Sequence, residues 1–120
     1  MKATLSRFWL ATLTAAALTA CSGKDDVGNI SQATSASLTP SNEQLAAVYN
    51  RSCRTCHTIA GTGAPLTGDE AAWAPLLAKG MDTLVDNVVN GVGGMPPLGL
   101  CMDCDAAQFE DLIRFMATGN

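Results

Sequence analysis

The strongest constraint on this chain of 120 residues is the run CRTCH at positions 53–57. Cys53 and Cys56 lie three positions apart, and His57, the only histidine of the chain, follows directly. This arrangement suits three kinds of chemistry: a metal site, a redox-active pair of thiols, or the attachment of a haem. Each of the three demands something different of the remaining sequence.

The haem interpretation gives a role to every one of these side chains. C-x-x-C-H is the attachment signature of c-type haem. Two thiols at this spacing reach the two vinyl groups on one edge of a porphyrin, and the histidine that follows is held at the iron as an axial ligand. The motif therefore predicts one haem c, bound covalently through Cys53 and Cys56, with His57 on the iron.

Two haem-free interpretations remain open at this point. A zinc site would use Cys53, Cys56, Cys101 and Cys104, because two C-x-x-C pairs form a known zinc pattern. It would leave His57 without a role, and it needs thiolates that are hard to maintain in an oxidising compartment. A thioredoxin-like dithiol needs a βαβ setting, which the sequence does not predict.

The N-terminus predicts export. Lys2 and Arg7 precede an apolar run at residues 8–18, which is shorter than the roughly 20 residues that span a bilayer and is typical of a signal peptide. The sequence LTAC that ends at Cys21 resembles the lipobox of bacterial lipoproteins. We therefore expect residues 1–20 to be a signal peptide of the lipoprotein type.

In that family the signal is cut before the cysteine, which then carries lipid. We expect lipidation at Cys21 and a protein held by this lipid to a membrane that faces the periplasm. The alternative is ordinary cleavage near Ala20, with Cys21 as a spare thiol. Residues 21–40 are small and polar, and we interpret them as a flexible tether that leads to a folded domain at residues 41–120.

Charge excludes one class of partner. From residue 22 onward the chain holds five basic and eleven acidic residues, which gives a net charge of −6. Nucleic-acid binding needs a basic surface, so we do not expect it. An acidic protein can dock on a partner with a positive patch.

Apolar periodicity predicts an all-α domain with about four short helices. The first should begin at Pro40, or at a capping box of Ser41 and Gln44, and run into Cys53. A loop rich in glycine, threonine and proline follows at residues 59–69, and a second loop, MPPLGLCMDC, is expected at residues 95–104. A core of this size is marginal without a staple, a metal or a cofactor.

The other three helices have their own signals. One is expected over residues 69–79, ended by Gly80. Asp82 can cap the next, whose apolar stripe extends to Val92. A capping box of Asp105 and Gln108 predicts the last helix, whose apolar face comprises Phe109, Leu112, Ile113 and Met116.

The sixth position on the iron needs a second ligand, and the chain has no second histidine. Besides the lysines, the candidates beyond the signal peptide are Met81, Met95, Met102 and Met116. Met95 lies in a loop and precedes two prolines, which stiffen the backbone around it. We therefore expect Met95 to bind the iron opposite His57, an arrangement that raises the haem potential.

Cys101 and Cys104 form the second cysteine pair. In an exported protein we expect a disulfide, which would contribute on the order of 2 kcal/mol. Two free thiols or a redox-active pair are the alternatives. With one lipid, two haem attachments and one disulfide, all five cysteines of the chain have a role.

The folded part resembles small class I c-type cytochromes, and most closely the bacterial cytochrome c-five type. The shared segments are CRTCH, GTGAP, GDEAAWAP, KGMDTLVDNVVNG, GGMPP and CMDC. The resemblance implies a haem c wrapped by helices, with His57 and Met95 on the iron. It also implies that the Pro65 carbonyl accepts the Nδ1–H of His57.

The resemblance carries three further implications for single residues. It implies the Cys101–Cys104 disulfide. Trp73 falls where the family has a tryptophan near the haem propionates, although a plain core aromatic is the alternative. Relatives often carry arginine and lysine where this chain has Leu76 and Leu98, so a charged contact to the propionates is missing.

The expected function is that of a single-haem electron carrier with redox proteins as donor and acceptor, and not an enzyme by itself. We expect a monomer or weak oligomer, with membrane contact through the N-terminal lipid. Leu98 and Leu100 are either an apolar docking patch beside the haem edge or part of the core. The alternative function is ligand or peroxide chemistry at an iron with a labile sixth ligand.

Overall fold

The computed structural model describes residues 30–120, in which helices joined by loops form the regular secondary structure. Its only β-type pairing there is an isolated bridge between Val92 and Met95. The prediction of an all-α fold is therefore confirmed. The expected signal peptide and Cys21 lie outside the described residues. Within the described range no helix combines the length and the apolar character needed to cross a membrane.

The first predicted helix is a continuous stretch of three segments. It comprises α2 (Glu43–Val48), a π-helical turn η1 (Tyr49–Cys53) and α3 (Arg54–His57). It reaches Cys53 as expected and continues beyond the prediction to His57. Its cap differs from the prediction: Asn42, not Ser41, accepts a hydrogen bond from the Leu45 N–H at 3.0 Å. Asn is at least as good an N-cap as Ser, and the capping box with Gln44 does not form.

Helices α4 (Glu70–Leu77) and α6 (Ala106–Thr118) follow their sequence signals closely. The Asp69 carboxylate caps α4 by accepting from the Ala72 N–H at 3.1 Å. Asp105 and Gln108 form the predicted capping box at the start of α6. These starts are set by residues three positions apart, so local sequence is sufficient to predict them.

Helix α5 (Met81–Asn90) departs from its prediction at both ends. Its N-cap is Gly80, and Asp82 lies inside the first turn, where a carboxylate favours the positive end of the helix dipole. The helix ends at Asn90, so Val92 is not part of its apolar stripe. Val92 is instead 52% exposed and pairs with Met95.

The segment after Met95 contains a short 3-10 turn, η2 (Pro97–Leu100). Three consecutive residues there have positive φ: Leu98 at 59°, Gly99 at 54° and Leu100 at 67°. The left-handed region costs a leucine roughly 1–2 kcal/mol. This loop is therefore held in its shape by its surroundings rather than by local preference.

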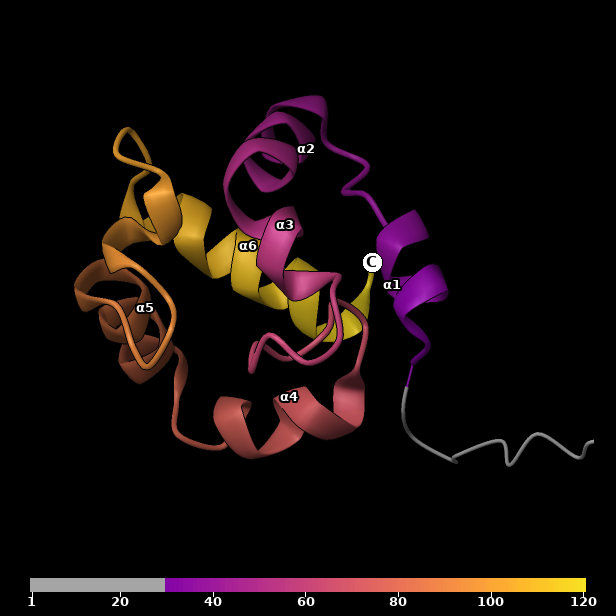
Figure 1. Cartoon of the computed structure of the whole chain (residues 1–120). Coiled ribbons are helices and arrows are strands. Elements are labelled where there is room, and N and C mark those ends of the chain that lie inside the picture. Colours follow the sequence, from indigo (N-terminus) through magenta and orange to yellow (C-terminus); the bar gives the residue numbers. More distant parts are fainter. Residues whose placement is uncertain (1–29) are drawn as a thin grey trace, which may run out of the picture.

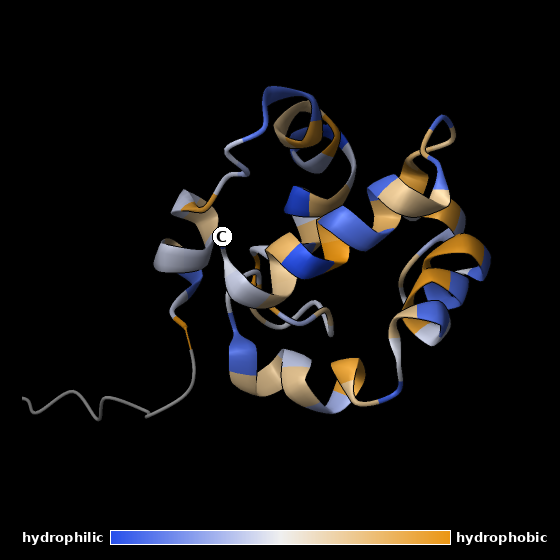
Figure 2. Ribbon diagram, turned by 180° about the vertical axis from the view of Figure 1, so that it is seen from behind, coloured by the Kyte–Doolittle hydropathy of each residue, from blue (hydrophilic) through white to orange (hydrophobic). Residues whose placement is uncertain are grey.

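The core lies along α6, which crosses behind α3 in the middle of the domain (Figure 1). Its buried face packs against α5, α4 and α2. Apolar and polar residues form separate bands along α5 and α6 (Figure 2). The largest core side chains on α6 are Phe109, Leu112, Ile113, Phe115 and Met116.

A helix that the sequence did not predict precedes these elements. α1 (Gln32–Ser37) begins with a Ser31 cap, whose hydroxyl accepts from the Thr34 N–H at 3.1 Å. Residues 30–40 were expected to be part of a flexible tether, and for this stretch the expectation is wrong. The segment folds because its polar groups find partners on the domain, as with Ser35, whose side chain is completely buried.

Candidate haem-binding site

A cavity of about 380 Å³ brings together the residues that the sequence singled out. One wall comes from the histidine side, residues 52–65, and the other from the methionine side, residues 92–100. Leu76 of α4 completes the lining. Among its members are Cys53, Cys56, His57 and Met95, and the volume is in the range of ligand pockets.

His57 is nearly buried, with 7% of its surface exposed. Its Nδ1–H donates to the Pro65 carbonyl at 2.8 Å, which is the contact that the family resemblance implied. The free ring nitrogen is then Nε2, the one available to a metal. Burial lowers the pKa of His57, and the hydrogen bond to Pro65 opposes this effect. A neutral imidazole is the form that binds iron.

The backbone of His57 is held as firmly as its ring. Its carbonyl accepts a hydrogen bond from the Thr67 N–H at 2.7 Å. The Thr67 hydroxyl is in turn bonded to the Tyr49 hydroxyl at 2.9 Å, and both side chains are fully buried. The loop that follows the motif is thereby tied to the helix that precedes it.

Trp73 is a brace for the histidine rather than a lining residue of the cavity. Its ring stacks near the His57 ring, with centroids 5.7 Å apart and an interplanar angle of 26°. Its Nε1–H donates to the Leu66 carbonyl at 2.9 Å. Because this donor is used by the backbone, the geometry favours the core interpretation of Trp73 over a contact with a propionate.

The cysteine environment argues against zinc. Burial raises the pKa of the Cys53 thiol to about 11, and the neighbouring Cys56 adds to the rise, so a metal-binding thiolate is disfavoured there. Cys101 and Cys104 are joined to each other, with Cα atoms 5.4 Å apart. In residues 30–120 the single close group of possible metal ligands is Cys101, Asp103 and Cys104. A four-cysteine zinc site is therefore wrong for the described chain.

Met95 is the one methionine of the described residues that lines the cavity. Its backbone pairs with Val92 in both directions, at 2.9 and 3.1 Å. The methyl group of Met95 lies close to Gly99: a Cβ added at Gly99 would be 3.3 Å from that methyl carbon. The other candidates lie elsewhere: Met116 is in the core, Met81 packs against it, and Met102 is 78% exposed.

The two leucines of the methionine loop have opposite environments. Leu98 packs against the core, whereas Leu100 lines the cavity and is 67% exposed. The core interpretation therefore holds for Leu98, whereas a docking role for Leu100 stays a prediction. Leu76 lines the cavity, and no charged side chain is among the lining residues. Val92 also lines the cavity, which the sequence analysis missed. The glycines of GVGG after α5 are the signal that could have indicated a loop there.

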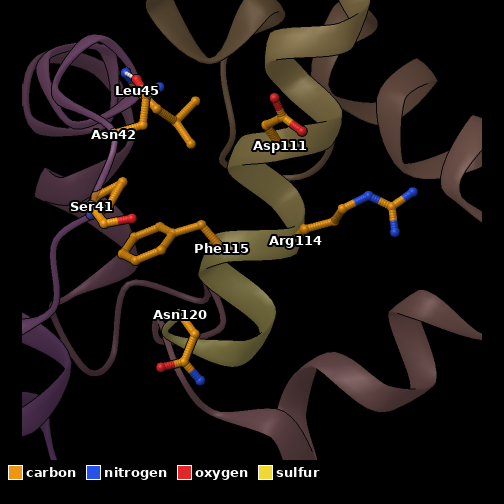
Figure 3. A pocket seen from close by; sticks show the side chains of 8 residues that line it. Ser41, Asn42, Leu45, Asp111, Arg114, Phe115 and Asn120 are labelled. Carbon is orange, nitrogen blue, oxygen red and sulfur yellow. Dashed lines mark hydrogen bonds between the residues drawn. The ribbon is translucent and has the colours of Figure 1, made fainter.

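A smaller cleft of about 220 Å³ lies between the start of α2 and the end of α6 (Figure 3). It shares no lining residue with the first cavity. Phe115 points toward Ser41 across this cleft, whereas the Arg114 side chain points away from it (Figure 3). Its polar groups do not converge, so it is not a second cofactor site.

Comparison with known proteins places the chain in a family. The family described as "Cytochrome C oxidase, cbb3-type, subunit III" matches residues 40–116. Cytochrome c-555 of Chlorobaculum tepidum is 42% identical over 74 residues, which cover 58% of this chain and 68% of that protein. Cytochrome c5 of Azotobacter vinelandii is 35% identical over 79 residues, with 64% and 92% covered.

The chain belongs to the class I c-type cytochromes. A solved structure agrees: a crystal structure of an electron transfer complex of nitrite reductase with cytochrome c contains a chain with a TM-score of 0.53 and 39% identity. The match covers 67% of this cytochrome and 94% of that chain. The family carries haem c bound through cysteines, and so does this cytochrome. The apolar cavity beside Cys53 and Cys56 fits that cofactor.

Proposed function

We propose that this cytochrome is a single-haem electron carrier, not an enzyme by itself. Cys53 and Cys56 are the attachment residues, and His57 and Met95 are the axial ligands. The observation that carries the proposal is one cavity lined by all four side chains. When bound, the haem supplies reversible one-electron exchange at its iron. The protein supplies rigidity, a low dielectric and a docking surface.

The two ligand side chains support this assignment in different ways. The Nδ1–H bond to Pro65 fixes the tautomer and orientation of the His57 ring, which leaves Nε2 as the ligand atom. Met95 offers a neutral thioether from the facing wall of the cavity. With both axial positions filled, substrate binding at the iron is disfavoured, and electron exchange is the remaining chemistry.

The exposed rim of the cavity is the proposed docking surface for redox partners. Val92 and Leu100 are 52% and 67% exposed there. An apolar rim on an acidic protein suits weak, transient complexes, which a carrier needs in order to release its partner. The solved relative was crystallised with nitrite reductase, and redox proteins of this kind are the partner class that we propose.

We also propose that the chain is exported to the periplasm and anchored by lipid at Cys21, with residues 1–20 removed as the signal peptide. The support is the charged start, the apolar run and the LTAC sequence. Growth in labelled fatty acid tests this directly: label should enter the wild-type protein and not a Cys21→Ala variant. Label in neither protein would contradict the anchor while leaving the haem proposal intact.

Periplasmic expression with haem maturation tests the carrier. We expect a red protein whose haem survives acid-acetone extraction and whose ferric spectrum has the methionine–iron charge-transfer band. Met95→Ala should lose that band and bind cyanide rapidly, whereas Met102→Ala, a change at an exposed methionine, should not. Rapid cyanide binding by the wild-type protein would instead favour the alternative, ligand or peroxide chemistry at a labile sixth position.

A further inference from the structure

Helix α1 lies outside the part of the chain that the family match covers, which begins at residue 40. It is nevertheless packed onto the domain, beside the C-terminal end of α6 (Figures 1 and 2). The segment of residues 30–38, here named the strap, contains α1 and its flanks. Its contacts converge on α3, which carries His57, and on the loop that follows it.

Arg54 holds the strap at its C-terminal end. This arginine is one of the two residues between the attachment cysteines, and the haem interpretation of the motif gives it no role. Its guanidinium donates to the Ala36 carbonyl and, at 3.4 Å, to the Leu38 carbonyl. The last carbonyls of a helix lack partners within the helix, and a cation placed there is favoured by the helix dipole as well.

Ser35 connects the strap to the axial histidine itself. Its hydroxyl donates to the His57 carbonyl at 3.3 Å, and no part of Ser35 is exposed. Three residues after His57, the Ala60 N–H donates to the Gln32 side-chain oxygen at 2.7 Å. The strap thus binds the backbone of His57 and of the loop that follows it, and none of residues 30–38 lines the cavity.

The strap also fits closely against the domain. A Cβ at Gly68 would lie 2.7 Å from Leu38 and 2.9 Å from Ile30, so only glycine lets these side chains approach. Gly68 follows Thr67, the residue whose N–H holds the His57 carbonyl. Leu38 is likewise in contact with Gly119 at the end of α6, where a Cβ would lie 2.9 Å away.

We propose that the strap is a positioning element for the axial histidine, locked in place by Arg54 and coupled to His57 through Ser35. The inference rests on the proposed ligation by His57. Because Arg54 and His57 lie on the same short helix α3, a displacement of Arg54 also displaces His57. A strap bound to this helix restricts the movement of the His57 backbone and, through it, the orientation of the imidazole ring.

The test uses the mature holoprotein in four forms: wild type, Arg54→Ala, Arg54→Lys and Ser35→Ala. Ser37→Ala is the matched control, because Ser37 lies on the same helix but is exposed and bonds only within it, to the Thr34 carbonyl. Limited proteolysis with subtilisin measures opening of the strap. The proton NMR shifts of the haem methyls in the ferric protein report the orientation of the axial imidazole.

For Arg54→Ala we expect cleavage within residues 30–40 to be roughly tenfold faster or more, because charge-assisted hydrogen bonds are lost and cleavage follows the open population. The haem-methyl shifts should change as well. Arg54→Lys should restore part of both effects. Ser35→Ala should change the methyl shifts with a smaller effect on cleavage, and Ser37→Ala should change neither.

Three results would overturn the proposal. If the strap opens in Arg54→Ala while the methyl shifts stay at their wild-type values, the strap is an attachment and not a positioning element. If neither quantity changes in Arg54→Ala, Arg54 is not the lock. Ser35→Ala with unchanged methyl shifts would remove the coupling to His57. A wild-type protein without His-ligated haem would instead contradict the proposed function.

Discussion

The two walls of the haem cavity are built on different principles. On the histidine side, buried hydrogen bonds connect several elements: Tyr49 to Thr67, Thr67 to the His57 backbone, and Trp73 to Leu66. On the methionine side, Met95 depends on a one-residue bridge to Val92, a run of left-handed residues and a disulfide close in sequence.

This difference indicates which wall of the cavity opens at the lower free-energy cost. A buried network of satisfied hydrogen bonds is costly to open, because each group left without a partner costs free energy. A loop of glycines and strained leucines lacks that protection, and Gly93 and Gly94 are exposed. We therefore expect the methionine side to open more easily than the histidine side. Four substitutions test this contrast, from the largest expected effect to the smallest.

Gly91→Ala should have the largest effect. Gly91 has φ 78° and ψ 154°, a region that only glycine occupies readily, and a Cβ there would lie 2.8 Å from the Met95 carbonyl oxygen. Strain and overlap together should reduce the free energy of unfolding by roughly 3 kcal/mol or more, as measured by denaturant titration. Cyanide binding should also accelerate, because the methionine loop is displaced.

Gly80→Ala is the matched control for this substitution. Gly80 has nearly the same backbone, with φ 91° and ψ 148°, but no atom lies within 4 Å of a Cβ at that position. It should therefore cost only the backbone strain, about 1–3 kcal/mol, and leave cyanide binding unchanged. Equal effects of the two glycine variants would show that the approach of Met95 to Gly91 does not matter.

Removal of the disulfide comes second. The Cys101→Ser, Cys104→Ser double variant should be about 2 kcal/mol less stable, because a four-residue ring no longer restricts the unfolded chain. We also expect faster cyanide binding, since the ring follows the methionine loop directly. Met102→Ala, an exposed residue inside the same ring, is the control for both measurements. A double variant with wild-type cyanide kinetics would separate the disulfide from the Met95 loop.

Tyr49→Phe comes third and affects the histidine side. It removes one buried hydrogen bond and keeps the edge contact with Phe115 at 4.9 Å. Stability should fall by about 1 kcal/mol, while cyanide binding stays slow, because Met95 is untouched. In a cycle with Thr67→Val, the double variant should lose less than the sum of the singles. Strict additivity would argue that the two hydroxyls act independently.

Asp103→Asn should have the smallest effect on stability. Its carboxylate is paired with a residue of the helix that leads to the CRTCH motif, so it connects the methionine side to the histidine side. Arg51 of η1 is paired with Asp103 at 2.5 Å, and the hydrogen bond from Arg51 lowers the pKa of this carboxyl. A lowered pKa in the folded state adds stability above the ordinary pKa of the unfolded chain. This stability is lost as the pH falls through the lowered value.

The variant should therefore have a slightly lower unfolding midpoint at neutral pH and a shallower loss of stability in acid. Because both side chains are largely exposed, the neutral-pH effect should shrink further at high salt. Asp86→Asn, at an exposed carboxylate of α5, is the control. An unchanged acid profile would mean that the ion pair does not form in solution.

Local sequence predicted the parts of this protein that local interactions control. Asp69 and Asp105 cap their helices through residues three positions away, and both starts agree with the structure. The predicted caps at Ser41 and Asp82 were wrong because a residue one or two positions away, Asn42 or Gly80, is the cap instead. Choices between adjacent residues depend on small free-energy differences, which a pattern does not resolve.

The sequence by itself indicated the chemistry: of the three kinds of chemistry that the CRTCH motif suits, haem attachment is the one that gives both cysteines and His57 a role. Only the tertiary structure decided which polar residues serve the site. It buried Ser35 in a segment that composition alone marks as a tether, and it separated Leu98 from Leu100. The physical reason is that burial and hydrogen bonding between distant segments depend on packing, and a linear pattern of hydropathy does not contain that information.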